Sequence, residues 1–326
     1  MAEKKLKLAL PPIIGYLHHA YQLSVAQQHP SFNDWFYSNY IQLTYHPETG
    51  WLNFFLARLE CYPLVYYQLL NIQIFINNNI DIVDFIINCI NSGYYIWLYL
   101  DEFYVPNRIS YNTGHLIHEC LIYGYNTDKS CFYSAGFDTR HNYSFSEISY
   151  TDFIKAFYNS DINKPVNIVK HQETDRYNFD IQNVMNLLED YVYSKNTSKR
   201  LSIYSNPTSD VIYGLQIYEY LRKNFENPPT KEFLDDIRSL HILWEHKKCM
   251  TSRIKFLYEN KYLDKLEPYY SKYKEIENKA LALRNMQIKY TYTRDDDEIK
   301  KIATYIDEIR NEEKEILVEL LECIRK

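Results

Sequence analysis

Glycine and cysteine are both scarce in this chain, and their scarcity excludes several kinds of site. The 326 residues include only 7 glycines and 6 cysteines. The cysteines are widely spaced, with no Cys-x-x-Cys pair and no Cys/His cluster, so the sequence predicts no metal site. The chain also lacks a P-loop and a Gly-x-Gly-x-x-Gly motif, so no nucleotide cofactor is expected.

An excess of positive charge and a long apolar run are missing as well. The formal net charge is −6 at pH 7, which argues against a nucleic-acid partner. The basic start of the chain, MAEKKLKLALPP, has too short an apolar run for a signal peptide. Elsewhere Asn and Asp interrupt the apolar stretches, so no membrane span is expected. We therefore predict a soluble, cytoplasmic protein in a reducing compartment.

The chain does contain enough apolar material for a packed core, and it is arranged in two parts. Hydrophobic residues make up 46% of the sequence. Residues 1–172 mix short strand-like and helix-like segments, whereas residues 173–326 carry long helical patterns. The predicted fold class is therefore α+β. A domain with an antiparallel sheet and an early helix spans residues 1–172, and an α-helical bundle spans residues 173–326.

Local signals locate the individual elements. A helix over residues 81–91 is predicted because Asp81 can cap it and Gly93 can end it. Ser149 begins a capping box and predicts another helix. The predicted strands lie at residues 94–100, 116–125 and 131–137, with an edge strand at 166–169. Further helices are predicted at 15–28, 180–194, 209–225, from 230 to 258, 266–290, and from 295 to the C-terminus.

His118 and Asp138 are the strongest pair of candidate catalytic residues. His118 opens the strand His-Glu-Cys-Leu-Ile-Tyr-Gly-Tyr, and Asp138 ends the strand Ser-Ala-Gly-Phe-Asp. With the turn at residues 126–129, the two fall nearly opposite each other. An imidazole beside a carboxylate can deprotonate a nucleophile, because the carboxylate orients the base. The alternative is a buried histidine satisfied by a neighbour, with Asp138 capping the turn before Thr139.

Acidic residues at the end of the preceding strand are a weaker candidate. Asp101-Glu102 follow residues 94–100 and could contribute to a cleft. Acids at strand ends are, however, commonly solvated.

These motifs resemble the butirosin biosynthesis protein H N-terminal family, which is similar to C39 peptidases in its papain-like fold. The resemblance covers roughly residues 12–170, and that family has a similar helical C-terminal part. It implies that His118 is the catalytic base and Asp138 the orienting acid. It further implies amide-bond formation from an acyl group held as a thioester on a phosphopantetheinyl carrier protein, as in thiotemplated peptide or antibiotic biosynthesis. The segments that carry the resemblance are Asp101-Glu-Phe-Tyr-Val-Pro106, His115, His118 to Tyr125, Gly136-Phe-Asp138 and Glu147 to Tyr150.

The chain departs from this family where the resemblance implies a nucleophilic cysteine, at the start of the first helix. Gly15 stands at the expected position, in Gly-Tyr-Leu-His-His. Tyr16, His18 and His19 are further candidates for lining a cleft there, although a histidine on a helix surface is expected at least as often.

Two cysteines elsewhere in the chain are candidate replacements for the missing thiol. Cys120 lies two residues from His118 and so shares its strand face, but it lacks a helix N-terminus that would lower its pKa. Cys61 is the first cysteine of the chain and lies in an apolar segment, which predicts a structural role.

Three functions remain open from the sequence. The leading one is acyl transfer in which His118 activates an amine directly, without a covalent intermediate. Its partners would be an acyl or peptidyl carrier protein and a small-molecule or peptide acceptor. The second is a catalytically silent homologue that binds a carrier protein or a peptide intermediate. The third is a cysteine-peptidase-like hydrolase, which the missing thiol disfavours most.

Overall fold

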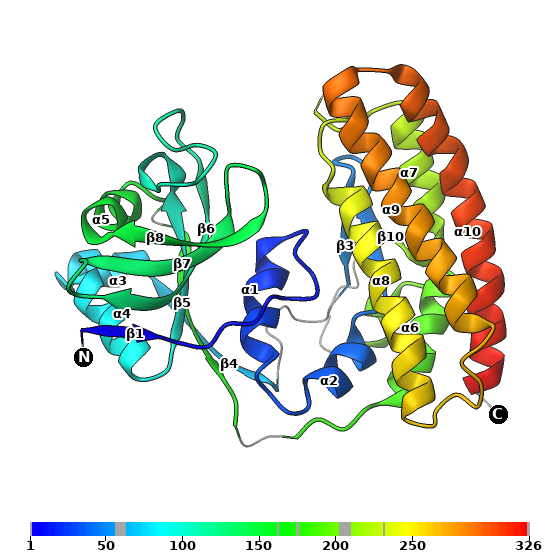
Figure 1. The fold of residues 1–326 in the computed structure, drawn as a ribbon, viewed down its shortest axis with the longest axis horizontal. Helices are drawn as coiled ribbons and strands as arrows, with labels where there is room; N and C mark the ends of the chain where they lie inside the picture. The colour runs from blue at the N-terminus through cyan, green and yellow to red at the C-terminus, as the bar shows by residue number, and fades with distance from the viewer. Residues whose placement is uncertain are drawn as a thin grey trace. The chain divides into compact units, whose positions relative to one another are not determined.

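The chain folds into two compact units (Figure 1). The computed structural model describes residues 2–55, 63–161, 163–173, 176–201, 210–230 and 232–324. One unit comprises Met1–Phe32 and Arg58–Arg176, and the other comprises Asn33–Ala57 and Tyr177–Lys326. The predicted change near residue 172 falls close to a boundary between units, whereas the segment that follows Phe32 folds with the C-terminal helices.

A buried arginine explains why that segment belongs to the helical unit. Arg253 is 0% exposed. Its Nε donates to the Tyr37 carbonyl at 2.8 Å, and its Nη2 donates to the Tyr40 carbonyl at 2.6 Å. These carbonyls lie at the end of a short helix, where backbone acceptors lack helical partners. The arginine satisfies them, so residues 33–57 are held by an interaction that spans more than 200 positions in sequence.

An antiparallel sheet of seven strands forms the centre of the first unit. Its order is β4-β9-β5-β6-β7-β8, and β1 pairs with β6. The predicted edge strand is wrong in one respect: β9 lies between β4 and β5, because residues 65–71 form a strand that pairs with it. The strands are β1 (Glu3–Lys5), β4 (Val65–Asn71), β5 (Tyr95–Asp101), β6 (Ile117–Asn126), β7 (Cys131–Phe137), β8 (Tyr143–Ser149) and β9 (Pro165–His171).

Capping residues begin two helices of this unit where the sequence predicts them. The Asp81 side chain accepts hydrogen bonds from two backbone N–H groups at the start of α4, and Gly93 follows that helix with a φ of +84°. Ser149 accepts a hydrogen bond from the Asp152 N–H at the start of α5. The helices are α1 (Leu17–Ala26), α3 (Ile72–Asn77), α4 (Ile82–Asn91), the 3₁₀ turn η1 (Glu102–Tyr104) and α5 (Tyr150–Tyr158).

Helices cover both faces of the sheet (Figure 1). On the face of α3, α4 and α5, Leu98 and Leu100 of β5 join the main apolar core. On the other face, the Tyr21 ring of α1 contacts Trp97 and Tyr143. Because side chains alternate along a strand, consecutive residues of β5 and β6 face different helices.

The second unit is a helical bundle with a three-stranded sheet of order β10-β2-β3. Its last helix buries Ile302, Ile306 and Ile309 completely, which confirms the predicted apolar stripe. The elements are α2 (Phe32–Asn39), β2 (Leu43–His46), β3 (Trp51–Phe54), α6 (Ile181–Val192), η2 (Thr197–Arg200), β10 (Ile212–Tyr213), η3 (Gly214–Gln216), α7 (Ile217–Glu226), α8 (Arg238–Glu259), α9 (Tyr269–Thr293) and α10 (Asp296–Ile324).

Two helices of this unit begin later than predicted. The helix expected over residues 209–225 starts only at Ile217, because Ile212 and Tyr213 pair with β2 as a short strand. The helix expected to open at Thr230 starts at Arg238. Strand pairing with a distant segment is invisible to a local periodicity pattern, which explains the first difference. Among the helices of the described residues, none is both long and apolar enough to cross a membrane.

Candidate functional site

A histidine–carboxylate pair lies where β5 ends and β6 begins. His118 pairs across the strands with Leu100, and Glu102 begins the turn that follows β5. The Asp101 side chain accepts a hydrogen bond from the Phe103 N–H and so holds this turn. Nδ1 of His118 lies 2.8 Å from Oε1 of Glu102, and the side chains are 34% and 7% exposed. A buried carboxylate therefore holds a partly exposed imidazole.

This pairing leaves one nitrogen of His118 available for chemistry. When Nδ1–H donates to the carboxylate, Nε2 carries the lone pair and can accept a proton. No residue in the described ranges forms a hydrogen bond with Nε2. This is the arrangement of a general base whose tautomer is set by an acid behind it.

A second pair of the same type lies beside the first. Nδ1 of His115 lies 2.6 Å from Oδ2 of Asp101, and the His115 ring stacks on Phe103 at 4.6 Å between centroids. The His115 side chain is 65% exposed, whereas the Asp101 side chain is 2% exposed. Its similar chemistry and adjacent position make this pair a natural control for the His118 pair.

Asp138 does not orient His118 in the structure. Its Oδ1 accepts hydrogen bonds from the backbone N–H groups of Arg140 and Asn142, at 2.8 and 2.9 Å. The Asn142 N–H makes the largest contribution to lowering the pKa of Asp138, with a smaller one from Arg140. Asp138 thus caps the turn between β7 and β8, as the alternative interpretation of the sequence has it, and Glu102 occupies the role expected for it.

The reason is that β6 and β7 separate before they reach these residues. Their pairing ends at Leu121 and Ala135; beyond this point β6 pairs only with β5, and β7 only with β8. The Tyr21 hydroxyl lies between the separated strands, 3.0 Å from the carbonyl oxygens of both Glu119 and Ala135. His118 and Asp138 lie three positions beyond the last pair of the β6–β7 ladder, so the register of the hairpin does not bring them together.

Helix α1 runs along the sheet with its first turn toward the His118 end. Tyr21 contacts the backbone of Glu119, which neighbours His118, whereas Gln28 beyond the helix end bonds the Tyr95 hydroxyl at 2.7 Å. The side chain of His118 is on the opposite face of the sheet, because its cross-strand partner Leu100 packs in the α3–α5 core. Glu119, the next residue of β6, faces α1, and burial raises its pKa.

The residues predicted to line a cleft gather at the start of α1. Gly15 and His19 are buried, and Tyr16 is the N-terminal cap residue. The Tyr16 and His18 rings stack at 5.3 Å, and the His18 and His19 rings lie 4.4 Å apart. Burial lowers the pKa of His18 to about 4, so its imidazole is neutral at physiological pH. These residues form a compact group, but they bring neither a thiol nor a hydroxyl nucleophile of the Ser or Cys type.

Cys120 does not have the properties of a nucleophile. It is 3% exposed, and burial raises its pKa to about 11 against the opposing effect of the nearby Arg108 guanidinium. The thiolate, which is the reactive form, is therefore rare at neutral pH. Cys61 lies outside the described residues.

Alkylation should distinguish these cysteines. In folded protein treated briefly with iodoacetamide near pH 8, we expect Cys323, which is exposed, to be modified well before Cys120 and Cys249. Burial raises the pKa of Cys249 to about 12, so both inner thiols are protonated and shielded. Peptide mass spectrometry measures the order, with urea-unfolded protein as the control. Early modification of Cys120 would contradict its buried placement.

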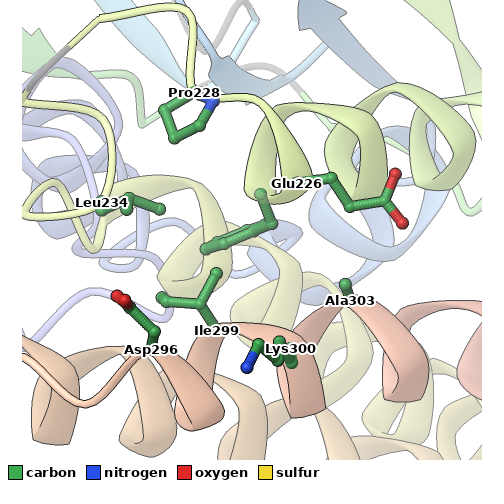
Figure 2. Close-up of a pocket in the computed structure, with 8 residues that line it drawn as sticks. Glu226, Pro228, Leu234, Asp296, Ile299, Lys300 and Ala303 are labelled. Carbon is green, nitrogen blue, oxygen red and sulfur yellow. The ribbon is translucent and has the colours of Figure 1, made fainter.

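A hollow in the helical unit is the other feature that could accept a ligand (Figure 2). It has a volume of about 400 Å³. Ile299 and Ala303 of α10 line it together with Glu226 of α7, whose carboxylate bonds Arg222. Among its lining residues there is no His, Cys or Ser, so it lacks the groups of the His118 site. In the described ranges, no cluster of three or more His, Cys, Asp or Glu side chains is arranged to hold a metal ion.

Comparison with models of known protein families gives no match, and comparison with curated proteins gives none either. The geometry of the site is therefore the basis for inferring a function. The sequence did not point to Arg108, and it offered Glu102 only as a weaker cleft candidate, not as the partner of His118. Glu102 had one usable signal, its place directly after the strand that pairs with β6.

Proposed function

We propose that this protein is an acyltransferase that forms an amide bond, with His118 as the general base. The observation that carries the proposal is the contact of 2.8 Å between His118 Nδ1 and Glu102 Oε1, with the carboxylate buried and the imidazole partly exposed. A base built in this way is worth about 10²- to 10⁴-fold in rate. The donor is a thioester on a carrier protein, as in thiotemplated peptide or antibiotic pathways.

The proposed reaction needs no covalent enzyme intermediate. The acceptor amine attacks the thioester carbonyl, the C–N bond forms, and the C–S bond breaks. Nε2 of His118 takes the proton that the amine loses and returns it to the departing thiolate. Holding donor and acceptor together supplies the rest of the acceleration. A route without a thiol nucleophile is consistent with the state of Cys120, because its raised pKa keeps that thiol protonated.

The papain-like character of the first unit is part of the proposal. It is supported by an antiparallel sheet with a helix whose first turn lies toward the histidine end. The departures are Gly15 in place of the thiol and the placement of His118 on the face away from α1. Both departures favour direct base catalysis over a peptidase-like hydrolysis.

A catalytically silent binding unit is the second candidate, and one observation favours it. The stretch between Glu102 and His118 exposes Ile109, Tyr111 and Leu116 by 49%, 39% and 43%. Several exposed apolar side chains within one short stretch are typical of surfaces that bind a partner. In that case a carrier protein or peptide would bind without turnover.

The test is an amide-forming assay with purified protein. A carrier protein loaded with a short acyl group, or the same acyl group as a small soluble thioester, is incubated with a panel of amines. We expect amide formation and thiol release in equal amounts above a no-enzyme control, with no acyl adduct in the intact-protein mass spectrum. A persistent adduct would point to a covalent route, and hydrolysis without amide would indicate a hydrolase. Carrier binding without turnover would favour the silent homologue.

A further inference from the structure

Arg108 is a buried cation without a counter-ion in the described part of the chain. It is 3% exposed, and its Nη1 donates to the Phe137 carbonyl at 2.6 Å. Its Nη2 is buried and has no hydrogen-bond partner among the described residues. The acids of the neighbouring turn, Asp101 and Glu102, are each paired with a histidine.

This arrangement is energetically costly unless something else pairs with the guanidinium. Burying an uncompensated ion costs several kcal/mol, and buried arginines usually bind carboxylates through two parallel hydrogen bonds. Strand β7 nevertheless has a glycine, Gly136, directly beside the guanidinium. A Cβ on Gly136 would lie 2.6 Å from Nη2 and 2.8 Å from Cζ of Arg108, so only glycine leaves room for the guanidinium.

The guanidinium lies on the same face of the sheet as His118. Ser134 pairs with the core residue Ile122, so Gly136, two residues further along, has the same orientation. Arg108 also lies close enough to Cys120 to affect its pKa. Cys120 and His118 are two residues apart, roughly 7 Å along the strand, so the cation and the base lie near the same end of β6.

We propose that the missing counter-ion is a carboxylate of the substrate, so that the acceptor is an amino acid. An α-amino acid carries its amine and its carboxylate on one carbon, so both groups can reach neighbouring partners through hydrogen bonds of about 3 Å each. Arg108 binds the carboxylate while Nε2 of His118 faces the amine. Entry requires the exposed residues after Arg108 to move, because Nη2 is closed to solvent. This inference rests on the proposed acyl transfer for the role of the amine.

The test compares alanine with alaninamide, which replaces the carboxylate by a neutral group of the same shape. At equal concentrations of free amine, we expect the wild-type protein to prefer alanine by about 10- to 100-fold in kcat/KM, the worth of a hydrogen bond to a charged group. Arg108→Met should abolish the preference, and Arg108→Lys should keep part of it. Gly136→Ala, which displaces the guanidinium, serves as a second variant if Arg108→Met does not fold. Equal use of both acceptors by an active wild-type protein would overturn the inference and leave the proposed reaction standing.

A binding measurement separates the two proposals. Isothermal titration with sodium acetate, with sodium chloride at the same ionic strength as control, is carried out on His118→Ala and on the Arg108→Lys/His118→Ala double variant. Acetate binding that the Arg108 substitution weakens supports the carboxylate site even if the wild-type protein forms no amide. Acetate binding that is insensitive to Arg108, or Arg108-dependent binding of inorganic phosphate in preference to acetate, overturns the assignment.

Discussion

Replacing Lys247 with Met should lower the free energy of unfolding of the protein by about 3–5 kcal/mol, because it leaves the charge of Glu313 buried and unpaired. Nζ of Lys247 on α8 lies 2.8 Å from Oε1 of Glu313 on α10, and both side chains are 0% exposed. Methionine fills a similar volume, so the loss reports the charge and not a cavity. Urea unfolding followed by circular dichroism measures it.

The surroundings of this ion pair explain why the expected loss is large. Hydroxyl groups of Tyr191, Tyr218 and Tyr273 donate to the Glu313 carboxylate from three further helices. Burial, with a smaller effect of that carboxylate, raises the pKa of each tyrosine well above its usual value. Lys247 and the three tyrosines are thus four partners arranged around one negative charge.

His246 completes the network on the side of Lys247. Its Nε2 donates to the Ile41 carbonyl at 2.7 Å, so its Nδ1 accepts from Lys247 at 3.0 Å. Burial and the neighbouring ammonium group lower the pKa of His246 well below its usual value. The imidazole is therefore neutral, and it links residues 33–57 to the ion pair.

Glu312 provides the control, because it adjoins Glu313 and pairs with Lys279 on the surface, at 42% and 40% side-chain exposure. Glu312→Gln should change the free energy of unfolding by less than about 1 kcal/mol. Glu313→Gln should lower the free energy of unfolding by about 3–5 kcal/mol. The double variant Lys247→Met/Glu313→Leu should be more stable than the sum of its single losses predicts, since neither charge remains. A loss below about 1 kcal/mol in Lys247→Met would show that the pair is not buried as described.

Local signals in the sequence predicted the elements that depend on neighbouring residues. The caps at Asp81 and Ser149 and the hairpin of β6 and β7 are determined within short segments, and all of them are present. The periodic stripe of α10 is also present. Such elements can be predicted because capping groups and helical spacing act over three or four positions.

Features that depend on distant partners were not predicted. The pairing of β4 with β9 and the attachment of residues 33–57 to the helical unit join segments far apart in sequence. The contact of His118 with Glu102, and not with Asp138, also depends on distant partners. It depends on where β6 leaves β7 and stays with β5, and no residue pattern within the hairpin marks that point.

Replacing His118 with Ala should reduce kcat/KM for amide formation by about 10²- to 10⁴-fold, because the reaction loses its proton acceptor. Glu102→Gln should lower kcat by about 10²-fold with little change in KM. A glutamine can donate to Nδ1, which moves the proton of the imidazole to Nε2 and removes the lone pair that accepts the amine proton. Steady-state kinetics with a soluble thioester measures both constants, and unfolding curves check that each variant is folded.

His115 and Asp101 are the matched controls, since they form the same type of contact in the same turn but with a far more exposed imidazole. His115→Ala should change kcat/KM by less than about threefold if only the His118 pair transfers protons. Added imidazole should restore part of the activity of His118→Ala and none of that of His115→Ala, because only the His118 position is expected to accept the proton of the amine. Equal losses of kcat/KM in both histidine variants, without rescue by imidazole, would show that the two pairs only stabilise the turn. His118 would then not be the general base.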